Sequence, residues 1–367
     1  MRHSRALAVT AAGVAAAIGF APAAQAHPSA HPTRLPSWQL ISTGSTEHFR
    51  GLAAVSRSVA WLGGYDGTVL RTTDGGRHWQ DVSPAGAGSL QFRDISASDA
   101  WHAVAMAAGG GTDSRLYQTS DGGRHWQLAY QNTDPAAFFD CMSFSDRQRG
   151  LVLSDPVDGK FRILATSNGG RSWRVLPNAG MPAAQTGEAG FAASGECLTT
   201  AGRDAWFGSG GGATARIFHS RDGGYHWSAL PAAQPSSPSS GVFGLAVRAG
   251  EHDRDRAERD WSPSAVIAVG GDFANPTASA GVAGVLTRSG WRPAASQPSG
   301  YRSGVTWLPG RGAAAVAVGL TGSDISFDGG WHWTTFDTGQ FDTVSCTRDG
   351  ACWAAGDLGR VAVLQRG

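Results

Sequence analysis

Three recurring patterns in this 367-residue sequence predict an all-β fold, a seven-bladed β-propeller of four-stranded antiparallel blades. A DGGxxW or NGGxxW turn recurs along the chain, an apolar strand lies upstream of each turn, and an aromatic-led strand lies upstream of that one. Self-similarity at a fixed period is the signature of repeat architectures. The 52 glycines and the charged fraction of only 16% suit a compact, turn-rich chain.

The turns are the clearest of the three patterns. Their copies are TTDGGRHW (72–79), TSDGGRHW (119–126), TSNGGRSW (166–173), SRDGGYHW (220–227) and SFDGGWHW (326–333), with a shortened copy TRSGW (287–291). The first position of the DGG or NGG triplet holds Asp74, Asp121, Asn168, Asp222 and Asp328. We expect this side chain to accept hydrogen bonds from turn N–H groups, while the glycines tolerate positive φ. The role predicted for these residues is therefore structural.

The strands upstream of the turns give the blade count. Seven apolar copies read AWLGG, AWHAVA, GLVLS, AWFGS, VIAVGG, VAVG and CWAAG. The aromatic-led copies read FRGLAAV, FRDISAS, FDCMSF, FGLAV, YRSGVTW and FDTVS, with a divergent one near 195–199. Each repeat is therefore predicted to hold four short antiparallel strands, with the turn joining the third strand to the fourth.

The two ends of the chain predict how the ring closes. A Trp-x-x-apolar pattern follows each turn and marks the fourth strand, and it occurs once more at Trp38, in SWQLI. The last repeat ends in GRVAVLQ and has no fourth strand of its own. Residues 37–41 are therefore predicted to complete the last blade. Radial closure leaves only short, protected sheet edges.

The first 26 residues resemble a secretory signal peptide. Arg2 and Arg5 precede an apolar run over 6–20, and Ala24-Gln25-Ala26 has the small residues of a cleavage site. An uncleaved N-terminal anchor is the alternative. With the signal peptide cleaved, the propeller would span 27–367 and the protein would be secreted or extracytoplasmic. The mature chain would have no membrane span, because no later apolar run is long enough.

Four cysteines suit an oxidising compartment. Cys346 and Cys352 flank TRDGA, which resembles a hairpin tip, and facing residues of a hairpin come within disulfide reach. Cys141 and Cys197 lie near the starts of inner strands in consecutive repeats. The sequence therefore leaves open whether they form a second disulfide.

Several features are assigned no binding role. The formal net charge of +1 indicates neither nucleic acid nor acidic lipid as a partner. The charged insertion 250–264 is interpreted as a solvated loop and not as a metal site, and 232–241 as a Pro/Ser-rich connection. No metal is expected elsewhere, because the turn histidines belong to separate blades. They are His78, His125, His226 and His332.

The repeated turns resemble the Asp-box, or bacterial neuraminidase repeat, and the chain resembles the photosystem II stability and assembly factor-like branch of Asp-box propellers. FFDCMSFSDRQRGLVLSDPVDGKFRILATSNGG, GEAGFAASGE and SGYRSGVTWLPG are similar to secreted bacterial members, which often carry oxidoreductase or sialidase-like labels. For photosynthetic members the resemblance implies binding of assembly intermediates without chemistry. The Asp-box itself does not support either label, because it stabilises a turn in enzymes and binding proteins alike.

Propeller topology predicts where a site would lie. The starts of the first strands and the loops from second to third strands share one face, opposite the turns. Near the channel mouth on that face we expect Arg50, Arg93, Asp140, Glu188, Tyr301, Arg302 and Asp342. The loops add Asp66, Asp155, Asp272 and Asp357. Convergent charges favour a ligand or partner site, or equally an ion-pair network that joins the blades.

We therefore predict a non-enzymatic binding or assembly protein, a monomer without a cofactor, whose partner is an unknown protein, a glycan or a small anion. A sialidase-like hydrolase is the first alternative, with Arg50, Arg93 and Arg302 on a carboxylate and Tyr301 beside Glu188. Sialidases, however, have six blades. An oxidoreductase with a channel-bound cofactor is the second alternative, although neither a strand–GxGxxG–helix unit nor a CxxCH motif occurs. Convergence of the three arginines would favour the hydrolase.

Overall fold

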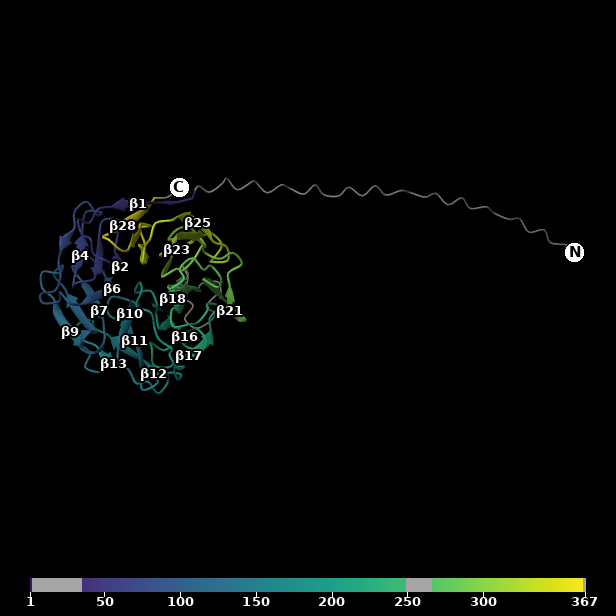
Figure 1. The fold of residues 1–367 in the computed structure, drawn as a ribbon, viewed down its shortest axis with the longest axis horizontal. Coiled ribbons are helices and arrows are strands. Elements are labelled where there is room, and N and C mark those ends of the chain that lie inside the picture. The colour runs from purple at the N-terminus through teal and green to yellow at the C-terminus, as the bar shows by residue number, and fades with distance from the viewer. Residues whose placement is uncertain (2–34, 249–265, 366–367) are drawn as a thin grey trace. The chain divides into compact units, whose positions relative to one another are not determined.

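The computed structural model describes residue 1 and residues 35–248 and 266–365. Within residues 35–367 these form seven four-stranded antiparallel sheets, which follow one another around a ring (Figure 1). This confirms the predicted all-β, seven-bladed propeller. In the described ranges the helical content is one 3-10 turn, Gly111–Asp113. The predicted signal peptide, apart from Met1, and the charged insertion 250–264 lie outside the described residues.

The two inner strands of each blade, numbered 1 to 7 in chain order, form the core. The first strands are β2 (Phe49–Ala54), β6 (Gln91–Ala97), β10 (Phe139–Phe144), β14 (Leu198–Ala201), β18 (Ser240–Val247), β22 (Gly304–Trp307) and β26 (Thr343–Cys346). The second strands are β3 (Ala60–Gly64), β7 (Ala103–Ala108), β11 (Gly150–Val157), β15 (Asp204–Gly208), β19 (Val266–Asp272), β23 (Ala315–Gly319) and β27 (Cys352–Ala355). Second strands such as β3 and β7 are buried along their whole length, which explains their unbroken apolar sequences.

The outer strands complete each blade. The third strands are β4 (Val69–Thr72), β8 (Arg115–Thr119), β12 (Lys160–Thr166), β16 (Arg216–Ser220), β20 (Ala283–Thr287), β24 (Gly322–Ser326) and β28 (Val361–Gln365). The fourth strands are β5 (Gln80–Asp81), β9 (Gln127–Gln131), β13 (Arg174–Val175), β17 (Ser228–Pro231), β21 (Gly290–Pro293), β25 (Thr334–Asp337) and β1 (Ser37–Ile41). The fourth strands are short and largely exposed, as β5 and β13 illustrate.

The DGG turns join third to fourth strands, and their geometry is local. In the first turn the Asp74 carboxylate accepts hydrogen bonds from the His78 N–H and the Thr72 hydroxyl, both at 3.0 Å. The Thr72 hydroxyl oxygen accepts in turn from the Gly76 N–H at 2.9 Å. Gly75 and Gly76 have φ of 78° and 82°, where glycine carries no steric penalty.

The N-terminal strand closes the ring. β1 pairs with β28 in antiparallel register from Ser37 opposite Gln365 to Ile41 opposite Val361. The Trp38 indole donates to the Ser323 hydroxyl of blade 6 at 2.9 Å, so the strand also contacts the neighbouring blade. Chain ends that are far apart in sequence thus share one sheet, as the sequence predicts.

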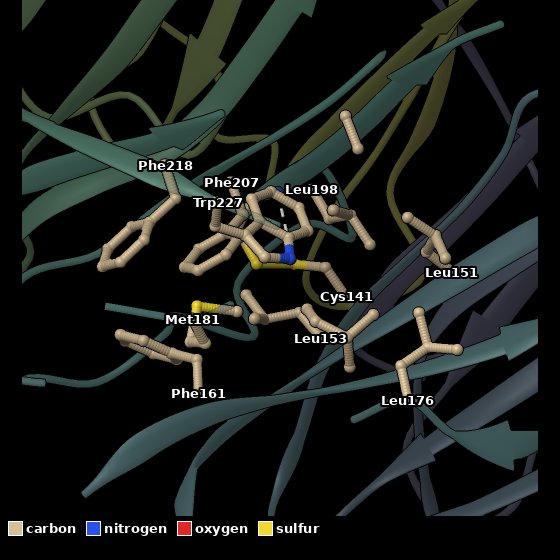
Figure 2. Close-up of a cluster of buried hydrophobic side chains, with 13 residues drawn as sticks. Cys141, Leu151, Leu153, Phe161, Leu176, Met181, Leu198, Phe207, Phe218 and Trp227 are labelled. Atoms are coloured by element: carbon tan, nitrogen blue, oxygen red, sulfur yellow. Dashed lines mark hydrogen bonds between the residues drawn. A yellow bond between two sulfur atoms is a disulfide. The ribbon is translucent and has the colours of Figure 1, made fainter. Parts of the chain in front are cut away.

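Apolar clusters lie between neighbouring blades, and one of them contains a disulfide. Between blades 3 and 4, Phe161, Phe207 and Trp227 pack around Cys141 and its bond to Cys197 (Figure 2). The second disulfide, Cys346–Cys352, joins facing residues of the β26–β27 hairpin. The Cys346–Cys352 bond confirms the predicted hairpin disulfide, and the Cys141–Cys197 bond decides the pairing that the sequence leaves open. Together they indicate an oxidising, extracytoplasmic environment. In the described part of the chain no helix is long and apolar enough to cross a membrane.

Candidate functional site

A pocket of about 370 Å³ lies where the first strands of the blades begin, and all seven blades contribute to it. It brings together five of the seven residues that the sequence places near the channel mouth, Arg50, Arg93, Asp140, Tyr301 and Asp342. The remaining lining residues are Phe138, Asp155, Gly190, Phe191, Ala192, Ala193, Pro238, Phe243, Phe273 and Leu320.

One wall of the pocket is an irregular segment that crosses the channel. We call residues 189–197, which precede β14 in blade 4, the crossing segment. Its Ala192 carbonyl accepts hydrogen bonds from Arg50 Nη1 of blade 1 at 3.4 Å and from Arg93 Nη1 of blade 2 at 3.3 Å. Because blade 1 is three blades away from blade 4, as far as a ring of seven allows, the segment extends over the centre of the ring. It therefore forms the wall of the pocket that faces the channel.

The C-terminal part of the crossing segment is hydrogen-bonded to blades 6 and 7. The Ser194 hydroxyl donates to the Ser303 carbonyl at 2.7 Å. The Glu196 carboxylate accepts from the backbone N–H groups of Val305, at 2.5 Å, and Val344, at 3.0 Å. Burial raises the pKa of Glu196 to about 8, although these bonds oppose the shift. The channel thus holds a carboxyl group that binds its proton more tightly than a solvated one.

Arg50 and Arg93 form the cationic part of the pocket. Their guanidinium carbons lie 5.8 and 5.6 Å from the centre of the Tyr65 ring, within cation–π range. Arg93 Nε and Nη2 donate to Gln91 at 3.0 and 2.6 Å, and Arg93 has no ion pair among the described residues. Arg50 Nε lies 3.7 Å from an Asp342 oxygen, so Arg50 is partly neutralised. Burial lowers the pKa of Arg93, yet an arginine keeps its charge in proteins.

Two carboxyl groups beside the arginines are held in a low-dielectric setting. Asp140 is 1% exposed, and its Oδ2 has no hydrogen-bond partner among the described residues. Burial, and then the nearby Asp155, raise the pKa of Asp140 well above its usual value. Burial also raises the pKa of Asp155 to about 6, even though its Oδ1 accepts from the Gly190 N–H at 2.8 Å. Below that pH the positive charge of the arginines dominates the pocket.

The opposite side of the pocket is aromatic. The Phe191 ring of the crossing segment stacks on Phe243, with ring centres 4.1 Å apart and planes at 18°. Tyr301 meets Phe243 edge to face at 4.8 Å. Tyr301 is buried, and this burial raises the pKa of its phenol. Phe273, on the loop between β19 and β20, packs edge to face on Phe243 at 6.1 Å and remains 45% exposed.

Two residues predicted for the channel mouth lie elsewhere. Arg302 is fully buried and donates through Nε to Asp324 of β24 at 2.6 Å, so it joins strands within blade 6. Glu188 is buried against Arg216 of β16, whose Nε donates to it at 2.8 Å. In both cases the partner lies on the third strand of a blade, away from the pocket. The three arginines that a sialidase-like site requires therefore do not converge.

Sequence reasoning missed the aromatic part of the site and the crossing segment. The sequence predicts no role for Phe191 or Phe273, and nothing in their spacing marks them. A usable signal was the stretch GEAGFAASGE, where blade 4 lacks the aromatic-led strand found in the other repeats. Among the described residues no group of three or more His, Cys, Asp or Glu side chains could hold a metal ion. The turn histidines each bond to the aspartate of their own turn, as His78 Nδ1 does to Asp74 at 2.6 Å.

Comparisons with known proteins identify structural neighbours but no family. No family model matches the sequence, and no curated protein matches it. YCF48 bound to a D1 peptide has a TM-score of 0.60 at 13% identity over 90% of this chain and 96% of that one. YCF48 from Cyanidioschyzon merolae has a TM-score of 0.56 at 13% identity, over 90% and 98% of the two chains. The Pan2 WD40 domain of Neurospora crassa has 0.55 at 12%, over 87% and 89%. Such identities establish the propeller fold alone.

Proposed function

We propose that this protein is a non-enzymatic, extracytoplasmic binding propeller that holds a segment of a partner protein in the channel-mouth pocket. The observation that carries the proposal is the pocket itself, whose walls come from all seven blades. Concave sites with a few convergent polar groups are the usual places for ligands. The predicted signal peptide and the resemblance to secreted Asp-box propellers support an extracytoplasmic location.

The two arginines of the pocket favour an anionic group on the partner, most strongly below about pH 6, where Asp155 is protonated. Arg50 and Arg93 converge on one backbone carbonyl, Ala192, which leaves part of their hydrogen-bonding capacity unused. Charge-assisted bonds from arginine to a carboxylate are among the stronger polar contacts. A protein segment as partner is supported by the structural neighbour YCF48, which was solved with a D1 peptide.

The environments of the other polar residues argue against hydrolysis of a sialoside. Arg302 pairs with the buried Asp324, and Glu188 pairs with the half-buried Arg216. Burial raises the pKa of the Tyr301 phenol, and the nearby Asp342 adds to that rise, so the phenol is poorly activated as a nucleophile. The contacts of Arg302 and Glu188 therefore support the interpretation that these residues form ion pairs within blades. They leave the pocket as a binding site.

The proposed function is tested by selecting peptides from a displayed library on the immobilised protein and measuring the Kd of the enriched peptides by calorimetry. Arg93→Gln should weaken binding roughly tenfold to hundredfold, because a charge-assisted bond is worth about 1.5–3 kcal/mol. Arg77→Gln is the matched control, since Arg77 is an exposed arginine in a turn on the opposite face.

Two outcomes would overturn the proposal. The first is a library that yields no peptide above background, or peptides whose affinity is the same for wild type and Arg93→Gln. The second is turnover of a fluorogenic sialoside that Arg93→Gln abolishes and Arg77→Gln leaves intact. The latter result would favour the glycosidase alternative.

A further inference from the structure

The pocket has two chemically distinct halves. Blades 1 and 2 supply the guanidinium groups of Arg50 and Arg93, whereas blades 4 and 5 supply the rings of Phe191, Phe243 and Phe273. A ligand that carried only an anion would use the first half and leave the second in contact with water.

The two halves meet at consecutive residues of the crossing segment. Ala192 provides the carbonyl that both arginines bind, and Phe191 provides the ring that stacks on Phe243. Neighbouring Cα atoms are about 3.8 Å apart, so the carbonyl that both arginines bind and the backbone that carries the Phe191 ring are one residue length apart. We therefore expect a peptide that uses both to carry its anion and its apolar side chain on adjacent residues.

Phe273 is the aromatic residue that internal packing does not explain. Phe243 is 2% exposed and belongs to a buried cluster, but Phe273 is 45% exposed at the edge of the pocket. Its backbone N–H donates to the Ser239 carbonyl at 3.1 Å, which anchors its loop. Its ring presents an edge to Phe191 at 6.4 Å and 75°. An exposed ring beside a stacked pair offers a partner ring both apolar area and an edge-to-face contact.

We propose, on the basis of the proposed function, that the pocket recognises a two-residue motif in which an aromatic residue adjoins an acidic one. Arg50 and Arg93 bind the carboxylate, and the aromatic side chain of the ligand packs against Phe273 and Phe191. Phe273 then determines specificity for the aromatic residue, and Arg93 determines specificity for the acidic one.

Three acetylated, amidated peptides test this motif by isothermal titration calorimetry with the intact protein. They are Gly-Phe-Asp-Gly, Gly-Ala-Asp-Gly and Gly-Phe-Asn-Gly. Wild-type protein should bind the first about tenfold or more tightly than either of the others. The first comparison removes a buried aromatic side chain, and the second replaces a carboxylate by an uncharged amide of similar shape.

Variants separate the two contributions. Phe273→Ser should abolish the discrimination between Phe and Ala peptides while keeping the discrimination between Asp and Asn. Arg93→Gln should have the reverse effect. Phe327→Ser is the matched control, because Phe327 is a 42% exposed aromatic residue on a turn of the opposite face, and it should leave both ratios unchanged. Phe273 is exposed, so its substitution is not expected to disturb folding, which a melting curve verifies.

The outcomes distinguish this inference from the proposed function. Equal affinity for the Phe and Ala peptides would overturn the inference and leave the binding function standing. Failure of all three peptides, together with a library that does yield Arg93-dependent binders, would also overturn the inference alone. Failure of the three peptides and of the library would overturn both. A preference for the Phe peptide that persists in Phe273→Ser would overturn the assignment of Phe273 as the residue that determines specificity for the aromatic side chain.

Discussion

At the scale of single residues, the repeated turns depend on a hydroxyl as much as on the aspartate. In the second turn the Thr119 hydroxyl oxygen accepts from the Gly123 N–H at 3.0 Å and donates to Asp121 at 3.0 Å. Asp121 Oδ1 accepts from the His125 N–H at 3.0 Å. The bonds to His125 lower the pKa of Asp121 to about 2. The other four turns repeat this arrangement with Thr or Ser in the hydroxyl position.

Replacing Thr119 by Val should destabilise the fold without changing the shape of the side chain. Thr119 is 1% exposed, so the Gly123 N–H would lose its acceptor inside the protein. Leaving such a group unsatisfied costs about 1–3 kcal/mol. Urea denaturation should show that loss in the free energy of unfolding. The exposed Thr112→Val is the control and should change it little. Equal values for the two variants would show that this hydrogen bond contributes nothing to stability.

Single residues also show how far side-chain positions can be predicted from the sequence. The sequence predicts Arg50 and Arg93 near the channel mouth because they occupy the same offset at the start of a recurring strand, and both line the pocket. Arg302 occupies that offset too, but Asp324 lies across the same blade and draws its side chain away from the mouth. A repeat gives the position of a backbone site. It does not give the partner that a long charged side chain selects.

At the scale of elements, the recurring sequence patterns predict the strands, but they do not predict the crossing segment. The pattern gave the blade count because each strand recurs in every repeat. The crossing segment occurs once and has no regular hydrogen bonding of its own, so no periodicity marks it. Its position depends on bonds to distant blades, such as those from Ser194 to Ser303 and from Val344 to Glu196. Contacts of this kind are visible only in three dimensions.

The carboxyl of Glu196 makes the crossing segment sensitive to pH. Its pKa is about 8 in the folded protein, against 4.5 for a solvated glutamate, because burial disfavours the charged form. The folded state therefore binds a proton more tightly, and the stability from this group is present below 4.5 and lost as the pH rises through 8. Thermal melts should show a lower Tm at pH 8.5 than at about pH 5.5.

Glu196→Gln isolates this contribution, because glutamine does not titrate. The fall in Tm between the two pH values should be smaller in the variant than in the wild type. It should not vanish, since burial also raises the pKa of Asp94, Asp140 and Asp155. An identical fall in both proteins would show that Glu196 does not titrate in this range.

At the scale of the whole molecule, stability and binding depend on the same closure. The pocket takes residues from all seven blades, so it exists only while the ring is complete. β1 completes blade 7 through five residue pairs with β28. The Trp79 ring of blade 1 meets the Trp353 ring of blade 7 edge to face at 6.1 Å, so these blades also pack directly. Loss of β1 would leave β28 as an unpaired edge and uncover the apolar side of blade 7.

A chain that begins at Ser42 should therefore have a much lower Tm than one that begins at Leu35, which retains β1. The comparison removes the five residue pairs with β28, the Trp38 bond to Ser323 and the contact of the Trp38 ring with Phe341. The shorter chain should also lose affinity for any library peptide, because blades 1 and 7 supply Arg50 and Asp342 to the pocket. Differential scanning calorimetry and peptide titration measure the two effects. If both chains melt at the same temperature, β1 is dispensable and the ring is closed by the packing of blades 1 and 7 alone.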